Sequence, residues 1–322
     1  MSANIDTLVT VFGGSGFIGR QVVRALAQRD FRIRVAVRRP DLAGHLQPLG
    51  RVGQIMPVQA NLRYPASVAA AMRGSHVAIN LVGILAASGQ QTFDAVQAEG
   101  AHHVAEAAQA VGARVVHVSA IGADENSESQ YARSKAAGEQ AIRAVSPDAI
   151  IFRPSVVFGP DDNFTNRFAS LARMSPVMPL IGGGETRLQP VFVGDVARAV
   201  ADAVDGRVRA GTTYELGGPE ILTMREVIAF ILDTIDRERM MVSVPFQLAR
   251  LQASLLQFAP QPLTLTPDQV TLLQSDNVVS ASAKAAGLTL EGLGIAPESL
   301  AAIAPSYLWR FRRAGQFERK NA

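Results

Sequence analysis

The sequence contains no cysteine among its 322 residues. This absence excludes disulfide bonds, zinc sites with cysteine ligands and iron–sulfur clusters held by thiolates. Even within a redox assembly, such a chain does not pass electrons through a cluster of its own. The five histidines are scattered apart from one adjacent pair, so the sequence gives no metal site.

Charge of one sign and long apolar runs are also scarce. The net charge is only +3, and nucleic-acid-binding proteins usually show a denser basic stripe, so we expect no nucleic-acid partner. Uncharged stretches such as residues 251–267 contain glutamine and three prolines, which argues against a membrane-spanning helix. The N-terminus shows neither a secretory signal nor a mitochondrial transit peptide. We therefore expect a soluble, cytoplasmic protein.

The first half of the chain alternates apolar strand patterns with helical patterns. This alternation predicts an α/β fold, a Rossmann-type doubly wound parallel sheet with helices on both faces. The predicted strands are residues 8–12, 33–37, 55–59, 77–82, 114–119 and 149–152, and the predicted helices are residues 17–28, 93–111 and 131–144.

After Arg153 prolines and glycines interrupt the pattern. We predict an NAD(P)-binding Rossmann domain over residues 1–155 and a smaller mixed α/β domain over residues 156–322, with segments exchanged between them. The second domain is expected to contain a helix capped by Asp195, a strand over 213–216 and a helix over 224–236.

A glycine loop, VFGGSGFIG, joins the first predicted strand to the first predicted helix. Gly13 permits a tight turn, Gly16 lets the backbone approach a pyrophosphate, and Gly19 lets the helix pack against the sheet. The helix N-terminus offers free N–H groups to the phosphates. The loop therefore predicts a dinucleotide site that also includes Ser15, Phe17 and Ile18.

Further cofactor contacts are predicted at the ends of the next strands. Arg38 and Arg39 stand where an NAD site usually has an acidic residue, and their guanidinium groups suit a 2′-phosphate. This favours NADP(H) over NAD(H), the alternative being a solvated basic turn. Position in the fold adds two pairs of candidates around the adenine and its ribose, Asn61 with Leu62 and Val82 with Gly83.

Tyr131 and Lys135 lie one helical turn apart in YARSK. A lysine ammonium near a phenol is expected to lower the pKa of the phenol and ready it for proton transfer. The same lysine is expected to hold the hydroxyls of the nicotinamide ribose.

The motifs VFGGSGFIG, NLVG, YARSK, FRPSVVFGP and PVFVGDVARAV together resemble the extended, or atypical, short-chain dehydrogenase/reductase superfamily. The resemblance implies a serine near the end of the fifth strand, which here would be Ser119, although Ala120 and Ile121 stand where this serine is often found. Ser127 and Ser129 are possible substitutes. It also implies that Pro154 and Ser155 line the nicotinamide pocket.

Two later stretches, residues 263–280 and 293–317, resemble the nucleotide-binding accessory subunit of respiratory complex I and its bacterial relatives. This narrower resemblance implies an NADPH-binding structural or regulatory subunit on the peripheral arm, at the cytoplasmic face of the inner membrane in a bacterium. The C-terminal tail adds a possible membrane contact. Its alternative is packing on its own domain; the residues concerned are Tyr307, Leu308, Trp309, Arg310, Phe311, Arg312, Arg313, Phe317, Arg319 and Lys320.

Three readings of the function therefore stay open. The first is an NADP(H)-binding accessory subunit of the NADH:quinone oxidoreductase with little or no turnover. The second is a free-standing NADP-dependent reductase or epimerase. The third is a nucleotide-sensing regulator that uses its second half as an interaction surface.

Overall fold

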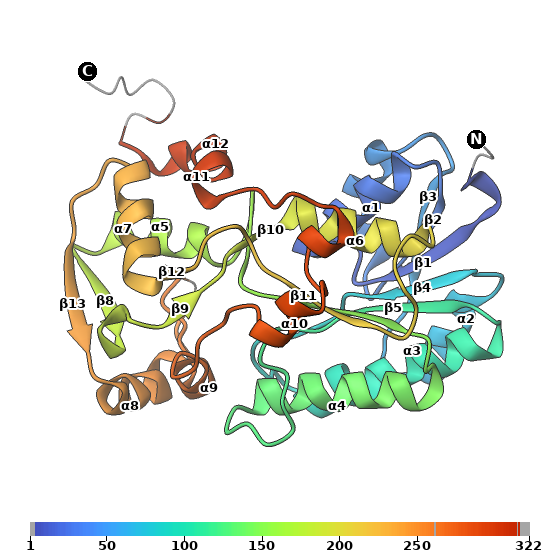
Figure 1. Cartoon of the computed structure of the whole chain (residues 1–322), viewed down its shortest axis with the longest axis horizontal. Coiled ribbons are helices and arrows are strands. Elements are labelled where there is room, and N and C mark those ends of the chain that lie inside the picture. Colours follow the sequence, from blue (N-terminus) through green and yellow to red (C-terminus); the bar gives the residue numbers. More distant parts are fainter. Residues whose placement is uncertain (1–3, 261, 314, 316–322) are drawn as a thin grey trace. The chain divides into compact units, whose positions relative to one another are not determined.

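The computed structural model describes residues 4–260, 262–313 and 315 (Figure 1). The chain divides into two compact units. Unit 1 consists of Met1–Pro154, Val193–Leu216 and Ala281–Ile295, and unit 2 consists of Ser155–Phe192, Gly217–Ser280 and Ala296–Ala322.

Unit 1 is built on a sheet of seven parallel strands in the order β11-β6-β5-β4-β1-β2-β3. This confirms the predicted Rossmann-type parallel sheet. The direction of strand order reverses between β1 and β4, the position at which such sheets bind ligands beyond the carboxyl ends of the strands. The strands are β1 (Leu8–Phe12), β2 (Arg32–Val37), β3 (Ile55–Gln59), β4 (Val77–Asn80), β5 (Arg114–Val118), β6 (Ile150–Pro154) and β11 (Thr213–Leu216).

Helices cover both faces of this sheet (Figure 1). Helix α1 packs against α6 on one face, and α2, α3 and α4 pack side by side on the other. A turn of π-helix, Asp94–Ala98, precedes α3. The helices of the unit are α1 (Phe17–Ala27), α2 (Pro65–Met72), α3 (Glu99–Ala110), α4 (Gln130–Val145), α6 (Val193–Val204) and α10 (Ala281–Ala285).

Two elements predicted for the second half belong to unit 1 instead. Strand β11 pairs with β6 and so adds a seventh strand to the sheet, and α6 packs on α1. Sequence periodicity gives the type of an element but not its partner, so the expected exchange of segments could not be assigned to these two elements from the sequence. Asp195 lies within the first turn of α6 and is not its N-cap residue, because the helix begins at Val193, three residues earlier than predicted.

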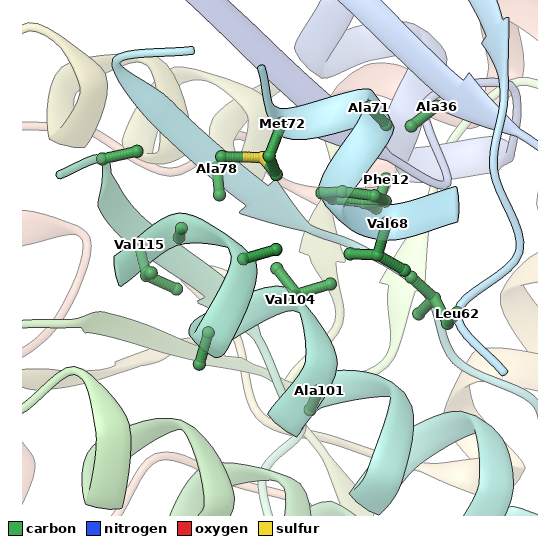
Figure 2. Close-up of a cluster of buried hydrophobic side chains, with 14 of the residues drawn as sticks. Phe12, Ala36, Leu62, Val68, Ala71, Met72, Ala78, Ala101, Val104 and Val115 are labelled. Carbon is green, nitrogen blue, oxygen red and sulfur yellow. The ribbon is translucent and has the colours of Figure 1, made fainter. Parts of the chain in front are cut away.

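The core between the sheet and α2, α3 and α4 is shown in Figure 2. Phe12, Val68, Met72 and Val104 fill it, and each is no more than 1% exposed. Helix α3 adds alanines to this core, which let it approach its neighbours closely. This packed layer fixes the carboxyl ends of β1, β4 and β5, where the candidate site lies.

Unit 2 contains three two-stranded sheets and several short helices. Helix α7 begins at a capping box formed by Thr223 and Glu226, and its apolar face packs with α5 and α12 around a second core. Its elements are β7 (Val157–Phe158), α5 (Thr165–Met174), β8 (Val177–Ile181), β9 (Arg187–Leu188), β10 (Val191–Phe192), β12 (Leu222–Thr223), α7 (Met224–Thr234), β13 (Met240–Val244), α8 (Phe246–Leu256), α9 (Pro267–Leu272), α11 (Leu300–Ile303) and α12 (Pro305–Leu308).

Candidate nucleotide-binding site

The glycine loop joins β1 to α1 with the geometry expected of a phosphate-binding turn. Gly13 has a φ of +79°, a conformation that favours glycine. A Cβ added at Gly19 would lie 2.3 Å from the carbonyl oxygen of Gly13, so only glycine lets α1 approach the loop this closely. Gly16 is the N-cap of α1 and supplies no side-chain cap. The N–H groups of the first turn, which includes Phe17 and Ile18, therefore face the loop without a capping side chain, next to the half-buried Ser15.

Arg38 and Arg39 follow the end of β2, and both are exposed. Arg39 does not extend into solvent alone, since its Nε and Nη2 donate to the carboxylate of Asp41 at 3.0 and 2.7 Å. This contact raises the pKa of Arg39 and lowers the pKa of Asp41, mainly through the side-chain hydrogen bond. A 2′-phosphate at Arg39 would have to share the guanidinium group with the Asp41 carboxylate or displace that carboxylate. At Arg38 no carboxylate contact among the described residues would have to be displaced.

The two candidate pairs at strand ends, Asn61 with Leu62 and Val82 with Gly83, differ in which of their atoms a ligand could reach. The Leu62 side chain is 6% exposed and belongs to the core in Figure 2, so only its backbone is available to a ligand. The Oδ1 of Asn61 accepts from the backbone N–H of Arg63, which holds the turn after β3. Val82 is half-buried beside the loop, and its Cγ2 would lie 3.1 Å from a Cβ added at Gly13.

Gly83 lies directly over the lysine of the YARSK motif. A Cβ added at Gly83 would be 3.0 Å from Nζ of Lys135 and 3.2 Å from Oε1 of Gln97. A side chain at position 83 would therefore crowd the ammonium group. The structure brings the glycine loop, the end of β4 and α4 together within unit 1, as the predicted site requires.

Tyr131 and Lys135 lie in α4, with Nζ of Lys135 5.9 Å from the centre of the Tyr131 ring. Lys135 is 6% exposed, and Nζ donates to the carbonyl of Val118 at 3.3 Å. Burial lowers the pKa of Lys135 to about 8, an effect opposed in part by the charge of Glu139. The expectation for Tyr131 was wrong in sign, since burial raises its pKa to about 12. Desolvation, which disfavours the charged phenolate, is the cause of this rise.

Sequence reasoning missed two buried polar side chains beside Lys135. Gln97, in the π-helical turn, donates from Nε2 to Ser134 Oγ at 2.7 Å, while its Oε1 has no hydrogen-bond partner among the described residues. His117 of β5 is 2% exposed, and neither ring nitrogen is hydrogen-bonded there. Burial, with a contribution from Lys135, lowers the pKa of His117 to about 3. The sequence contained one signal for His117, because it is a polar residue within the apolar strand RVVHV.

Ser119 follows β5 on the same face of the sheet as His117, since it lies two residues further along. Its side chain is 4% exposed, and its Oγ has no hydrogen-bond partner within the described part of the chain. The two possible substitutes have local roles. Ser129 Oγ caps α4 by accepting from the N–H of Ala132, and Ser127 Oγ accepts from the N–H of Ser129. Both hydroxyl groups therefore accept hydrogen bonds from backbone N–H groups at the start of α4.

Pro154 and Ser155 lie on either side of the division between the units. Pro154 ends β6 and is buried in unit 1. Ser155 belongs to unit 2, where its Oγ donates to Oδ1 of Asn277 at 2.6 Å. The hydroxyl of Ser155 is therefore already used to hold the loop before α10.

The described part of the C-terminal tail packs within unit 2. Tyr307, Leu308 and Phe311 are each no more than 8% exposed in the second core. Arg310 donates to Asn166 and Arg312 to the carbonyl of Thr234. Trp309 is 37% exposed, and Arg313 is also exposed. The structure therefore removes two of the three described aromatic side chains, Tyr307 and Phe311, from the surface expected at the tail. The tail residues Phe317, Arg319 and Lys320 lie outside the described residues.

Comparison with known proteins relates this site to a family. Residues 9–217 match the NAD dependent epimerase/dehydratase family. The chain is 33% identical over 96% of its length to the NADH dehydrogenase [ubiquinone] 1 alpha subcomplex subunit 9 of Arabidopsis thaliana mitochondria, of which it covers 79%. It is 39% identical to a ceramide reductase of Caulobacter vibrioides over 61% of each chain.

A solved structure shows the same fold. The NADPH-dependent quinone oxidoreductase of Escherichia coli, solved with NADPH, superposes with a TM-score of 0.72 over 94% of this chain and 99% of its own, at 18% identity. At that identity the likeness concerns the fold alone. With the family match over most of unit 1, it supports one conclusion: the chain belongs to the NAD-dependent epimerase/dehydratase family of extended short-chain dehydrogenases/reductases, and its relatives include subunits of respiratory complex I.

Proposed function

We propose that this protein is an NADP(H)-binding accessory subunit associated with the NADH:quinone oxidoreductase, with a structural or regulatory role and little or no turnover. One observation carries the proposal: the match to the complex I subunit of Arabidopsis thaliana extends over 96% of the chain, including the second half. The match to the ceramide reductase covers only 61%. A bacterial protein of this kind would bind peripheral-arm subunits at the cytoplasmic face of the inner membrane.

The residues of unit 1 fit a nicotinamide dinucleotide. The glycine loop leaves room for a pyrophosphate at the N-terminus of α1, where a positive dipole and free N–H groups favour phosphates. Gly83 places no side chain against the ammonium of Lys135, the group proposed to hold the ribose hydroxyls. Arg38 and Arg39, both exposed after β2, suit the 2′-phosphate of NADP(H).

The nucleotide preference is tested on the purified protein. Mass spectrometry should identify a retained NADP(H), and recovery of NAD(H) alone would contradict the assignment. Because paired N–H donors to a phosphate are lost, R38A/R39A should weaken NADP(H) at least about tenfold while changing NAD(H) little. The control R312A/R313A removes two arginines from unit 2 and should leave both affinities unchanged. Equal loss of both nucleotides in R38A/R39A would count against the proposed role.

A reductase acting on a lipid-like carbonyl is the second candidate, favoured by the intact pair Tyr131 and Lys135 and by the ceramide reductase relative. A bound dihydronicotinamide would supply the hydride in such a reaction. Tyr131, which burial keeps protonated well above neutral pH, would donate a proton to the developing alkoxide. Ala120 and Ile121, standing where the family's serine is often found, weigh against efficient turnover.

A pulldown separates the two candidates. The tagged full-length protein, captured from solubilised membranes of its own organism, should bring complex I subunits with it, and a tagged version of an unrelated cytoplasmic dehydrogenase should not. If no such subunits are recovered while NADPH oxidation with a ceramide-type ketone is measurable and is abolished by Tyr131→Phe, the reductase assignment replaces the accessory one.

A further inference from the structure

Helix α8 is apolar on its outward side as well as on its inward side. Inward, Ala249 and Ala253 are no more than 1% exposed and pack with Val270 of α9, and the partly buried Phe246 packs with the same cluster. The remaining large apolar side chains of α8, apart from the half-buried Leu256, point outward. Leu251 is 68% exposed and Leu255 is 76% exposed. A surface helix of a soluble protein normally buries its leucines and exposes small or polar residues, so α8 requires an explanation.

The exposed apolar residues form one continuous stripe. Leu248, Leu251 and Leu255 share a helical face, and Phe258, 84% exposed, follows in the turn where its N–H donates to the carbonyl of Leu255. At 100° per residue the four positions fall within about 80° of one another. We call these four residues the α8 stripe.

The exposed area of the α8 stripe helps to decide whether it binds a lipid surface or forms a stable protein interface. Taking about 200 Å² for each large side chain, the four exposed fractions sum to roughly 550 Å². A patch of this size is at the upper end of what monomeric proteins expose and is often functional. It is smaller than the about 800 Å² per partner of a stable protein–protein interface.

The distribution of charged residues around the α8 stripe also favours a lipid surface over a protein partner. Arg250 is the only charged residue between Arg239 and Asp268, so no carboxylate near the stripe in sequence repels an anionic surface. The positions that flank the stripe carry uncharged Gln247 and Ser254 together with Arg250, and these line a shallow groove with Gln274. A protein partner is usually selected through charged pairs at a polar rim, which α8 does not provide.

We propose that α8 lies in the surface of a phospholipid bilayer, with the α8 stripe inserted among the upper acyl chains and Arg250 near the phosphates. A helix lying in this plane buries its apolar face about 5–10 Å below the headgroups and does not span the membrane. No helix in the described part of the chain has the length and apolar composition to cross a bilayer. The proposal deepens the membrane placement in the proposed function, but moves the contact from the C-terminal tail to α8.

Flotation of the purified full-length protein with vesicles tests this surface directly. The vesicles consist of equal parts phosphatidylcholine and phosphatidylglycerol. We expect the wild-type protein to float with them and L251Q/L255Q to lose at least about tenfold in binding. The control M56Q/M174Q removes two other exposed apolar side chains, 61% and 64% exposed, and should bind like the wild type. Thermal unfolding of each variant checks that it folds.

Several results would overturn the proposal. Failure of the wild-type protein to float would do so, as would unchanged binding by L251Q/L255Q or equal loss in the control pair. Sedimentation velocity adds another: a wild-type dimer that L251Q/L255Q converts to a monomer would assign the stripe to a second copy of the chain. Because vesicles contain no complex I and no substrate, these outcomes are independent of the pulldown that tests the proposed function.

Discussion

Helices α4 and α8 break the ordinary burial rule in opposite directions. Helix α4 buries two charged residues, Lys135 and Glu139, each no more than 6% exposed. Helix α8 exposes leucines and buries alanines. Buried charge and exposed large apolar patches are the two departures that carry information about function. In unit 1 the unusual feature is therefore a set of charged side chains in the interior, and in unit 2 it is a set of apolar side chains on the surface.

The buried charge of α4 is costly, and its partners determine whether the fold tolerates it. Glu139 accepts from Nε and Nη2 of Arg153 at 2.8 and 2.7 Å, a two-pronged contact between α4 and β6. Lys135 has a backbone carbonyl, the neighbouring carboxylate and the ring of Tyr131 to offset its burial. The exposed leucines of α8 carry a much smaller cost to the folded chain, because the unfolded chain exposes them as well.

The largest effect is expected when the ion pair between Glu139 of α4 and Arg153 of β6 is broken. Glu139→Gln removes the carboxylate that is hydrogen-bonded to the Arg153 guanidinium, whose side chain is 29% exposed. Breaking a buried ion pair costs about 3–5 kcal/mol, and partial exposure of the arginine reduces this to about 3 kcal/mol. Urea denaturation measures the change. Glu185→Gln is the control, since Glu185 is mostly exposed and lies 3.9 Å from its arginine partner. Similar losses in the free energy of unfolding of both variants would mean that the Glu139–Arg153 pair behaves as a surface ion pair.

A second prediction uses pH to test the burial of Lys135. Below pH 8 the folded and unfolded chains both hold its proton, so the cost of the buried charge is fully present. Above pH 8 the folded chain loses the proton first, so the free energy of unfolding rises by about 2 kcal/mol by pH 9.5. Above about pH 10 the raised pKa of Tyr131 reverses the trend.

The measurement is urea denaturation at pH 7.5 and pH 9.5 for the wild type, Lys135→Met and Lys284→Met. Lys135→Met should remove the rise, because no buried ammonium remains to be discharged. Lys284 is exposed, and its substitution should leave the rise intact. A rise of the same size in Lys135→Met would show that another group causes it.

The smallest effect is expected from a comparison of the two faces of α8. Ala253→Leu adds three carbon atoms to a fully buried position and should cost about 1–2 kcal/mol through overpacking. Leu255→Gln on the exposed face should change the free energy of unfolding by less than about 0.5 kcal/mol. The urea midpoint at constant slope measures both. Comparable losses would show that the α8 stripe is packed in solution and would remove the contrast with α4.

Much of unit 1 could be predicted from its sequence. β1 and β3 have the predicted bounds, and the sheet is parallel as the continuous apolar runs required. The turn at Gly13 and the close approach at Gly19 also follow from the motif, since only glycine permits both. These features are local, because each depends on a few neighbouring residues.

The remaining features depended on contacts between distant segments. Residues 213–216 read as a strand, yet only the fold pairs them with β6. The sign of the pKa shift at Tyr131 depended on burial, and the spacing of YARSK says nothing about how much water reaches the phenol. Gln97 comes to Lys135 from a separate helical turn, so no linear motif contains both.

The sequence by itself determined the parallel sheet, the glycine loop and the positions of Tyr131 and Lys135 on one helical face, because short-range sterics and periodicity fix them. Only the tertiary structure decided which side chains lose contact with water. It buries Lys135, Tyr307 and Phe311, and it leaves three leucines of α8 exposed. Whether a side chain is buried depends on what the rest of the chain packs against it, and a helical pattern records amphipathicity without recording which face meets the core.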